Sequence, residues 1–269
     1  MTGYVHGYGK RESKRLKDQA DTLARLLHRG TRYPAGSRVL ELGCGTGAQT
    51  VHLASGSPEA EIVSADLSPD SLEIAREKAA RRGLANVSFQ QADVFALPFA
   101  PASFDHAFVC FVLEHLAEQE RALRCIREVL KPGGTLTVIE GDHRSWYAHP
   151  YSPFAQKAVD CLVAAQARLG GDANIGRRLY PLLGSAGFCQ VKVRPKTVYV
   201  DASRPGLVEG FSKNTFIAMV EAAEKQAIDM GLSTKEEWDQ GIRDLYRATE
   251  EDGTFLYTFF KARAVAPAG

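Results

Sequence analysis

The sequence lacks the features that mark several large classes of protein. Its 269 residues carry a formal net charge of +1, so the total charge does not indicate a nucleic-acid or acidic membrane partner. No apolar run approaches the roughly 20 residues of a membrane span, and the N-terminus has no apolar segment of the signal-peptide kind. We therefore expect no nucleic-acid partner, no membrane association and no export.

Cysteine is scarce, and its positions form no recognisable pattern. The five cysteines include no C-x-x-C pair; they are Cys44, Cys110, Cys125, Cys161 and Cys189. An odd, scattered set argues against both a disulfide framework and a zinc site. We expect a reduced, cytoplasmic setting and no bound metal.

What the sequence does contain is an alternation of short apolar runs with longer helical patterns. The runs at 37–43 and 61–67 are typical of buried parallel strands, and the next helix is predicted to begin at Ser68 and end near Gly83. The alternation continues to residue 141, and two later β-like runs at 190–200 and 254–264 bring the strands to seven. This rhythm predicts an α/β, doubly wound, Rossmann-like fold with a mostly parallel seven-stranded sheet and helical cap insertions.

The same pattern divides the chain into five segments. We expect an N-terminal helical lid at 1–30, with Leu16, Ala20, Leu23 and Leu27 on its apolar stripe. The remaining segments are an α/β ligand-binding core at 31–144, a helical substrate region with a return strand at 145–200, a helical cap insertion at 201–253, and a final strand with a tail at 254–269. Within the cap, a capping box from Ser233 to Glu236 predicts the start of a helix.

A glycine-rich loop, "VLELGCGTGAQT", follows the first strand. Gly43, Gly45 and Gly47 allow a tight turn and a close approach to a ligand, and Gly43, Gly45 and Ala48 also satisfy the dinucleotide fingerprint. The loop alone therefore leaves NAD open. Glu41 favours S-adenosylmethionine instead, because a carboxylate here would repel a pyrophosphate and attract an ammonium or sulfonium group.

Five motifs in order make residues 38–142 similar to the class I S-adenosylmethionine-dependent methyltransferases. They are the glycine loop, the acid that ends the second strand, "ADVFALPFAPASFD", "SFDHAFVCFVLEHL" and "EVLKPGGTLTVIE". The sequence most resembles the small-molecule branch of that family that is typified by ubiquinone and menaquinone methyltransferases. The resemblance implies S-adenosylmethionine as the cofactor.

The resemblance also assigns individual residues to the cofactor. Asp66 would hold the ribose hydroxyls, Leu67 would lie against the adenine, Asp93 would meet the adenine amino group, the Val94 backbone would meet a ring nitrogen, and Phe111 would pass the methionine moiety. On residues alone, Asp66 could equally cap the following helix.

In members of this family an N-terminal segment closes over the cofactor. By that resemblance Tyr8, Arg15 and Gln19 are candidates to meet the methionine carboxylate or the substrate, although a solvated basic helix edge is an equal alternative. Gln49, which begins the helix after the glycine loop, is a further cofactor-binding candidate.

The stretch "VIEGDHRSWYAHPYSPF" crowds polar and aromatic side chains behind the fifth apolar run. It emerges at the carboxyl edge of the predicted sheet, where a family member would hold its methyl acceptor. His143 is the leading candidate for a general base or an acceptor-orienting group, with Glu140 or Asp142 setting its orientation. Candidates for the substrate-binding wall are Trp146, Tyr147, Tyr151, Tyr199 and Phe216. We interpret Glu114 and His115 as packing or capping residues.

These observations predict an enzyme that transfers a methyl group from S-adenosylmethionine to an O, N, S or C nucleophile of a small molecule. Two alternatives stay open: a cyclase or regulatory protein that binds the cofactor without methyl transfer, and a nicotinamide-dependent reductase. A homodimer would also be compatible with the apolar stripe at Phe211 and Met219, which could equally line a pocket.

Overall fold

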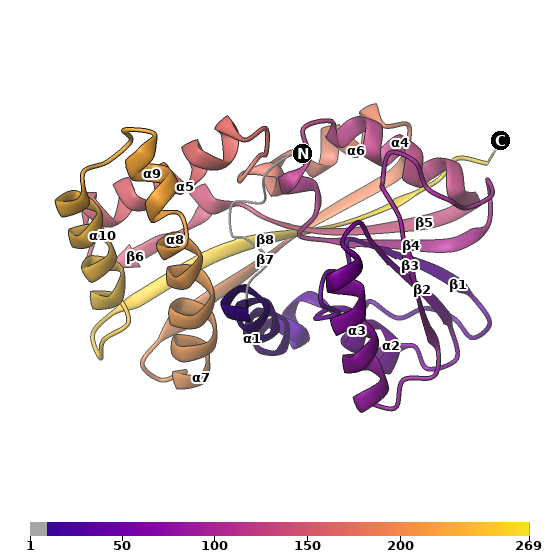
Figure 1. Ribbon diagram of the computed structural model, residues 1–269, viewed down its shortest axis with the longest axis horizontal. Coiled ribbons are helices and arrows are strands. Elements are labelled where there is room, and N and C mark those ends of the chain that lie inside the picture. The colour runs from indigo at the N-terminus through magenta and orange to yellow at the C-terminus, as the bar shows by residue number, and fades with distance from the viewer. Residues whose placement is uncertain (1–9, 269) are drawn as a thin grey trace.

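The computed structural model describes residues 10–268 and shows an open twisted sheet with helices against both faces (Figure 1). The strands run in the order β3-β2-β1-β4-β5-β8-β6, and β7 pairs with β8. Their bounds are β1 Arg38–Leu42, β2 Glu61–Asp66, β3 Val87–Gln91, β4 Phe104–Cys110, β5 Leu130–Gly141, β6 Tyr147–His149, β7 Cys189–Asp201 and β8 Thr254–Val265. β1 to β5 are parallel, and β8 is antiparallel to β5, β6 and β7. The mostly parallel Rossmann-like class is confirmed.

The expected number of strands was wrong by one. The sheet of the described chain has eight strands, because the short segment Tyr147–His149 pairs with Leu256 to Thr254 at the start of β8. Three residues are too few to show a clear alternating pattern, so the sequence predicted a loop at this position.

The helices begin and end largely where local signals place them. Their bounds are α1 Lys10–Leu27, α2 Thr50–Gly56, α3 Pro69–Arg81, α4 Gln119–Val129, α5 Pro153–Arg168, α6 Leu179–Ser185, α7 Pro205–Leu207, α8 Ala218–Glu221, α9 Glu224–Asp229 and α10 Lys235–Arg247. Three single turns, η1 Leu113–His115, η2 His143–Ser145 and η3 Ile175–Arg178, and a π-helical segment, η4 Val208–Ile217, complete the set. The Ser68 hydroxyl caps α3 by accepting from the Ser71 N–H at 3.2 Å, as predicted.

The capping box of the cap insertion lies one residue later than expected. The Thr234 hydroxyl accepts from the Glu237 N–H, and the Glu237 carboxylate accepts from the Thr234 N–H. Ser233 and Glu236 therefore flank the box that opens α10. Two adjacent hydroxyl residues and two adjacent glutamates made both registers compatible with the sequence.

The core is divided by the sheet into two layers of apolar side chains. On β1, Val39 belongs to the layer that α1, α2 and the cap cover, whereas Leu40 and Leu42 face the layer with α4 and α6. Because both faces of the sheet are buried, the sequences of the parallel strands are continuous apolar runs. Among the described residues, no helix has both the length and the apolar character needed to cross a membrane.

The cap insertion packs against α1 through η4 and so forms part of the same body as the core. In Figure 1, α1 lies between α7 and α8 on one side and α2 and α3 on the other. The contact between α1 and η4 is close, because a Cβ on Gly210 would lie 2.3 Å from the Thr22 hydroxyl. This packing brings residues from both ends of the chain to the carboxyl edge of β4 and β5.

Candidate functional site

The glycine loop after β1 has a backbone that only glycine adopts readily. Gly43, Gly45 and Gly47 have φ angles of 69°, 50° and 73°. A Cβ on Gly43 would lie 2.3 Å from Val112 Cγ2, whereas one on Gly45 would meet nothing within 4 Å. The loop is therefore packed against the segment after β4 on one side and open on the other.

Asp66 fastens this loop to the end of β2. Its Oδ2 accepts from the Gly45 N–H at 2.8 Å, and its Oδ1 accepts from the Ser68 N–H at 2.9 Å. Asp66 thus holds the loop in place and fixes the backbone just before α3, while Ser68 and not Asp66 is the N-cap of that helix. Beside Asp66, the Leu67 side chain is 65% exposed, which leaves an apolar surface at the strand end.

Glu41 does not lie at the open mouth of the loop as expected. Its side chain is buried beneath the loop, and its Oε2 accepts from the hydroxyls of Thr50 at 2.7 Å and Ser64 at 2.5 Å. Burial raises the pKa of Glu41 to about 7 despite these two hydrogen bonds. The residue supports the loop from below and carries only part of a negative charge at neutral pH.

Asp93 and Val94 lie at the same edge of the sheet as Asp66. The Ala92 N–H donates to the Asp66 carbonyl at 3.0 Å, which fixes the following segment beside the end of β2. Asp93 is exposed, and its Oδ1 accepts from the Phe95 N–H, while Val94 is half-buried. Asp93 and Val94 therefore lie at the edge of the sheet formed by the carboxyl ends of the strands.

A cavity of about 490 Å³, including the open space at its mouth, lies at the ends of β4 and β5. Its walls come from α1, from the segments after β4 and β5, from η4 and α8, and from β8. The lining residues are Arg15, Leu16, Gln19, Phe111, Glu114, His115, Gly141, His143, Phe211, Thr215, Phe216, Met219, Tyr257 and Phe259. Five predicted site residues, Arg15, Gln19, Phe111, His143 and Phe216, thus meet in one place. Tyr8 lies outside the described residues.

Phe111 and Val112 join the loop to the cavity. Phe111 ends the β4 region with a φ of 58°, which is unusual for a residue with a side chain, and its N–H donates to the Ile139 carbonyl at 2.9 Å. Its ring lies 5.5 Å from that of Phe259 in the cavity wall, while Val112 packs against Gly43. The two parts of the candidate site are therefore adjacent.

His143 faces the cavity from η2 and is fixed through one ring nitrogen. Its Nδ1 lies 2.7 Å from the Tyr257 hydroxyl oxygen. Its Nε2 has no hydrogen-bond partner within the described residues and lies 3.9 Å from Glu114 Oε2. Burial lowers the pKa of His143, so the ring is neutral at physiological pH.

Glu140 supports η1 and does not orient His143. Its Oε1 accepts from the N–H groups of Val112 at 3.0 Å and Leu113 at 2.8 Å, whereas Oε2 is buried without a partner in the part of the chain described. Burial, followed by the nearby Glu114 charge, raises the pKa of Glu140 well above its usual value. Through these two contacts the Glu140 carboxyl group holds the turn after β4.

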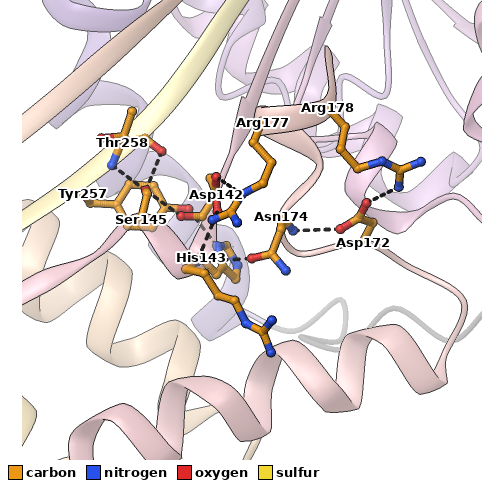
Figure 2. A network of polar contacts seen from close by, with 10 residues as sticks. Asp142, His143, Ser145, Asp172, Asn174, Arg177, Arg178, Tyr257 and Thr258 are labelled. Carbon is orange, nitrogen blue, oxygen red and sulfur yellow. Dashed lines mark hydrogen bonds and ion pairs between the residues drawn. The ribbon is translucent and has the colours of Figure 1, made fainter. Parts of the chain in front are cut away.

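Asp142 also differs from its expected role. Its carboxylate pairs with the Arg177 guanidinium through contacts of 2.6 and 2.8 Å, on the side of η2 that faces η3 (Figure 2). Asp172 pairs with Arg178 in the same network, and Asn174 accepts from the Arg144 N–H. Asp142 thus anchors the β5–η2 turn to η3, while Tyr257 holds the His143 ring.

Four aromatic candidates for the substrate wall do not line the cavity. Tyr147 and Tyr151 are 72% and 74% exposed, and Tyr199 is 42% exposed. Trp146 is buried, but it lies behind Phe216, with ring centroids 5.7 Å apart. Pairing of β6 with β8 turns Tyr147 outward, so the density of aromatic residues in the sequence was a misleading signal.

Gln49 is also engaged elsewhere. Its Oε1 lies 2.6 Å from His28 Nε2, which connects the start of α2 to the end of α1. The side chain therefore ties the end of the N-terminal helix to the core.

Several lining residues were missed or misassigned from the sequence. Glu114 and His115, interpreted as packing or capping groups, face the cavity, and Tyr257 and Phe259 come from the last strand. The run "TFLYTFFKA" did carry a signal, because alternate aromatic residues on a strand share one face. Within the described residues, no three His, Cys, Asp or Glu side chains are arranged to hold a metal ion.

Comparisons with known proteins point to one family. A family model described as a methyltransferase domain matches residues 34–187. A demethylmenaquinone methyltransferase of Thermus thermophilus is 44% identical over 106 residues, which are 39% of this chain and 48% of that protein. The O-methyltransferase cnsE of Penicillium expansum is 38% identical over 151 residues, 53% of this chain and 54% of that protein. The chain spans about half the length of the curated relatives it matches.

A solved structure extends the likeness beyond the matched segment. The [4+2]-cyclase SpnF aligns over 94% of this chain and 81% of its own, with a TM-score of 0.57 and 23% sequence identity. At this identity the likeness concerns the fold, which hosts more than one chemistry.

Proposed function

The chain belongs to the methyltransferase domain family, and from that premise we propose that it transfers a methyl group from S-adenosylmethionine to a small-molecule acceptor. The observation that supports this proposal is the contact between Gly43 of the glycine loop and Val112, because the neighbouring Phe111 lines the aromatic cavity. A cofactor seated on the loop would present its reactive end to an acceptor in the cavity. The sulfonium group of that cofactor supplies an activated methyl carbon.

The residues at the loop fit such a cofactor. The open side of Gly45 leaves room for a ligand close to the backbone, Asp66 offers a carboxylate at the end of β2, and exposed Leu67 offers an apolar face. Asp93 and Val94 would meet the adenine from the next strand end, and Phe111 would meet the methionine moiety. Arg15 and Gln19 would close the site from α1.

The chain contributes to the reaction chiefly by positioning. The rings of Phe111, Phe211 and Phe259 form part of the cavity wall, and His143 supplies a polar ring nitrogen there. Holding two reactants in one geometry lowers the barrier by removing the cost of their encounter. His143 is therefore the candidate for a proton acceptor or for an acceptor-orienting group.

Calorimetry of cofactor binding tests the proposal. We expect S-adenosylmethionine and S-adenosylhomocysteine to bind and NADH to bind negligibly. Replacing Asp66 by Ala should weaken binding by about 1 to 3 kcal/mol, because hydrogen bonds to a charged acceptor are lost. The matched control is Asp70→Ala, which removes an exposed carboxylate from the first turn of α3. This variant should bind the cofactor normally. Unchanged affinity of Asp66→Ala would remove that residue from the site.

A labelling experiment separates methyl transfer from cofactor binding without methylation. The enzyme is incubated with metabolite extract and methyl-labelled S-adenosylmethionine, and the products are analysed by mass spectrometry. Label in a new compound together with an equal amount of S-adenosylhomocysteine supports methyl transfer. Cofactor binding without label transfer would support the cyclase or regulatory alternative.

Four finer expectations extend the proposal. Five cysteines outside any disulfide support a reducing compartment such as the cytoplasm. The balanced net charge supports a small-molecule acceptor over a nucleic acid. Closure of the N-terminal segment as a lid, and assembly as a homodimer, are predictions for proteolysis and sedimentation experiments.

A further inference from the structure

Two buried glutamates, Glu114 and Glu140, lie near the cavity in different surroundings. Glu140 is held by two backbone N–H groups, and burial together with the nearby Glu114 charge raises its pKa well above the usual value. Glu114 lines the cavity itself. Only Glu114 is placed to exchange a proton with a molecule bound there.

The surroundings of Glu114 favour its charged form. His115 Nε2 lies 3.7 Å from Oε1, and the Gln166 amide donates to Oε2 at 3.3 Å. His143 from η2 and Arg15 from α1 line the same cavity. Burial raises the pKa of Glu114, but His115 and the other polar neighbours outweigh that effect and hold it below its usual value.

The hydrogen bonds of Tyr257 determine which nitrogen of His143 carries the proton. The Tyr257 hydroxyl is buried, so its proton needs an acceptor. Within the described residues that acceptor is His143 Nδ1, at 2.7 Å. A buried hydroxyl that fails to donate is costly, and a neutral ring whose Nδ1 accepts must carry its proton on Nε2.

His143 Nε2–H and the Glu114 carboxylate therefore form a donor and an acceptor that face each other across a gap. The two atoms are 3.9 Å apart, too far for a direct hydrogen bond. A single oxygen or nitrogen atom about 2.8 Å from each would bridge them at an angle of about 90°, which suits a protic group that both donates and accepts.

We propose that Glu114 is the proton-accepting residue of the acceptor site and that His143 orients the acceptor by donating from Nε2. This inference rests on the proposed function. The proton of the acceptor's protic group passes to Glu114 Oε2 as its bond to oxygen or nitrogen breaks. The electron pair stays on that atom and forms the bond to the methyl carbon, and the pair of the broken carbon–sulfur bond returns to sulfur. His143 keeps its proton throughout.

Nitrogen NMR of the complex with S-adenosylhomocysteine tests the two required protonation states without any acceptor. At pH 7 the ¹⁵N shifts should show His143 protonated at Nε2, with His143→Gln providing the assignment. Tyr257→Phe should redistribute the proton between the two nitrogens. The ¹³C shift of the Glu114 carboxyl, assigned with Glu114→Gln, should be that of a carboxylate. A proton on Nδ1, or a protonated Glu114, would overturn the inference.

Rates of label transfer test the role itself. With the metabolite extract as the source of acceptor, Glu114→Gln should lower the rate about 100-fold or more, in line with typical acid–base contributions. Its affinity for S-adenosylhomocysteine should stay within about threefold of the parent. Glu118→Gln, which removes an exposed charge just beyond η1, is the control and should react normally. A Glu114→Gln rate within about threefold of the parent would contradict the assignment.

The two proposals fail in distinguishable ways. If the unsubstituted protein binds the cofactor but transfers no label, the proposed function fails, and the NMR experiment still decides the states of Glu114 and His143. If the unsubstituted protein and Glu114→Gln transfer label at equal rates, the proposed function is supported and the role assigned to Glu114 is wrong.

Discussion

The two halves of the candidate site are built in different ways. The cofactor half consists of a loop and strand ends that follow one another between Glu41 and Phe111 in the core of the chain. The acceptor half draws on α1, η1, η2, η4 and β8, which are spread over most of the chain. Local sequence rules therefore describe the first half well and the second poorly.

The largest effect is expected from a substitution at Gly43, which disrupts the cofactor half of the site. Gly43→Ala forces a Cβ to within 2.3 Å of Val112 Cγ2 at a φ of 69°, so the loop must shift away from the cavity. We expect S-adenosylhomocysteine to bind at least about 100-fold more weakly by calorimetry. The matched control is Gly30→Ala, which has a φ of 76° but no atom within 4 Å of the added Cβ. Equal affinities for both variants would show that the contact with Val112 does not shape the site.

The next largest effect is expected from substitutions at His143, which test how the acceptor half of the site works. A glutamine can donate from its amide much as Nε2–H does, whereas leucine cannot donate at all. His143→Gln should therefore lose about 10-fold in the rate of label transfer and His143→Leu about 100-fold or more, both with unchanged cofactor affinity. If the two variants lose activity equally, and by 100-fold, His143 acts as a base and its assignment as a donor is wrong.

The smallest expected effect is on stability and concerns His28, which helps to attach α1 to the core. Burial lowers the pKa of His28 to about 4, from 6.5 in an unfolded chain, although the Gln49 side chain opposes the shift. The unfolded state therefore binds more protons between these values, and the free energy of unfolding should fall as the pH drops from about 6.5 to about 4. His28 should account for on the order of 2 kcal/mol of that loss.

Urea denaturation across this pH range measures the His28 contribution. His28→Gln should reduce the slope of stability against pH, with His149→Gln on the surface as the control. The same slope in all three proteins would exclude His28 as the source.

Residue spacing predicted those parts of the structure that depend on local rules. Ser68 and Gly83 bounded α3, and the glycines after β1 placed the loop, because capping and positive φ angles are properties of a few consecutive residues. The acid at position 66 was correctly placed at the end of β2, and its contact with the Gly45 N–H gives that position a physical reason.

Residues whose partners are distant in sequence could not be assigned in this way. His143 is fixed by Tyr257, 114 positions away, and Asp142 by Arg177, 35 positions away. Glu114 looked like a helix-start residue because nothing near it in sequence shows that η1 faces a cavity. Tyr147 looked like a pocket wall until its pairing with Leu256 turned it to solvent.

A crystal structure with S-adenosylhomocysteine tests most directly whether the two halves form one site. The account predicts that the cofactor sulfur opens into the cavity beside Phe111, on the side where His143 Nε2 and Glu114 Oε2 face each other. A cofactor bound with its sulfur turned away from the cavity, or separated from it by the Phe111–Val112 segment, would contradict the account.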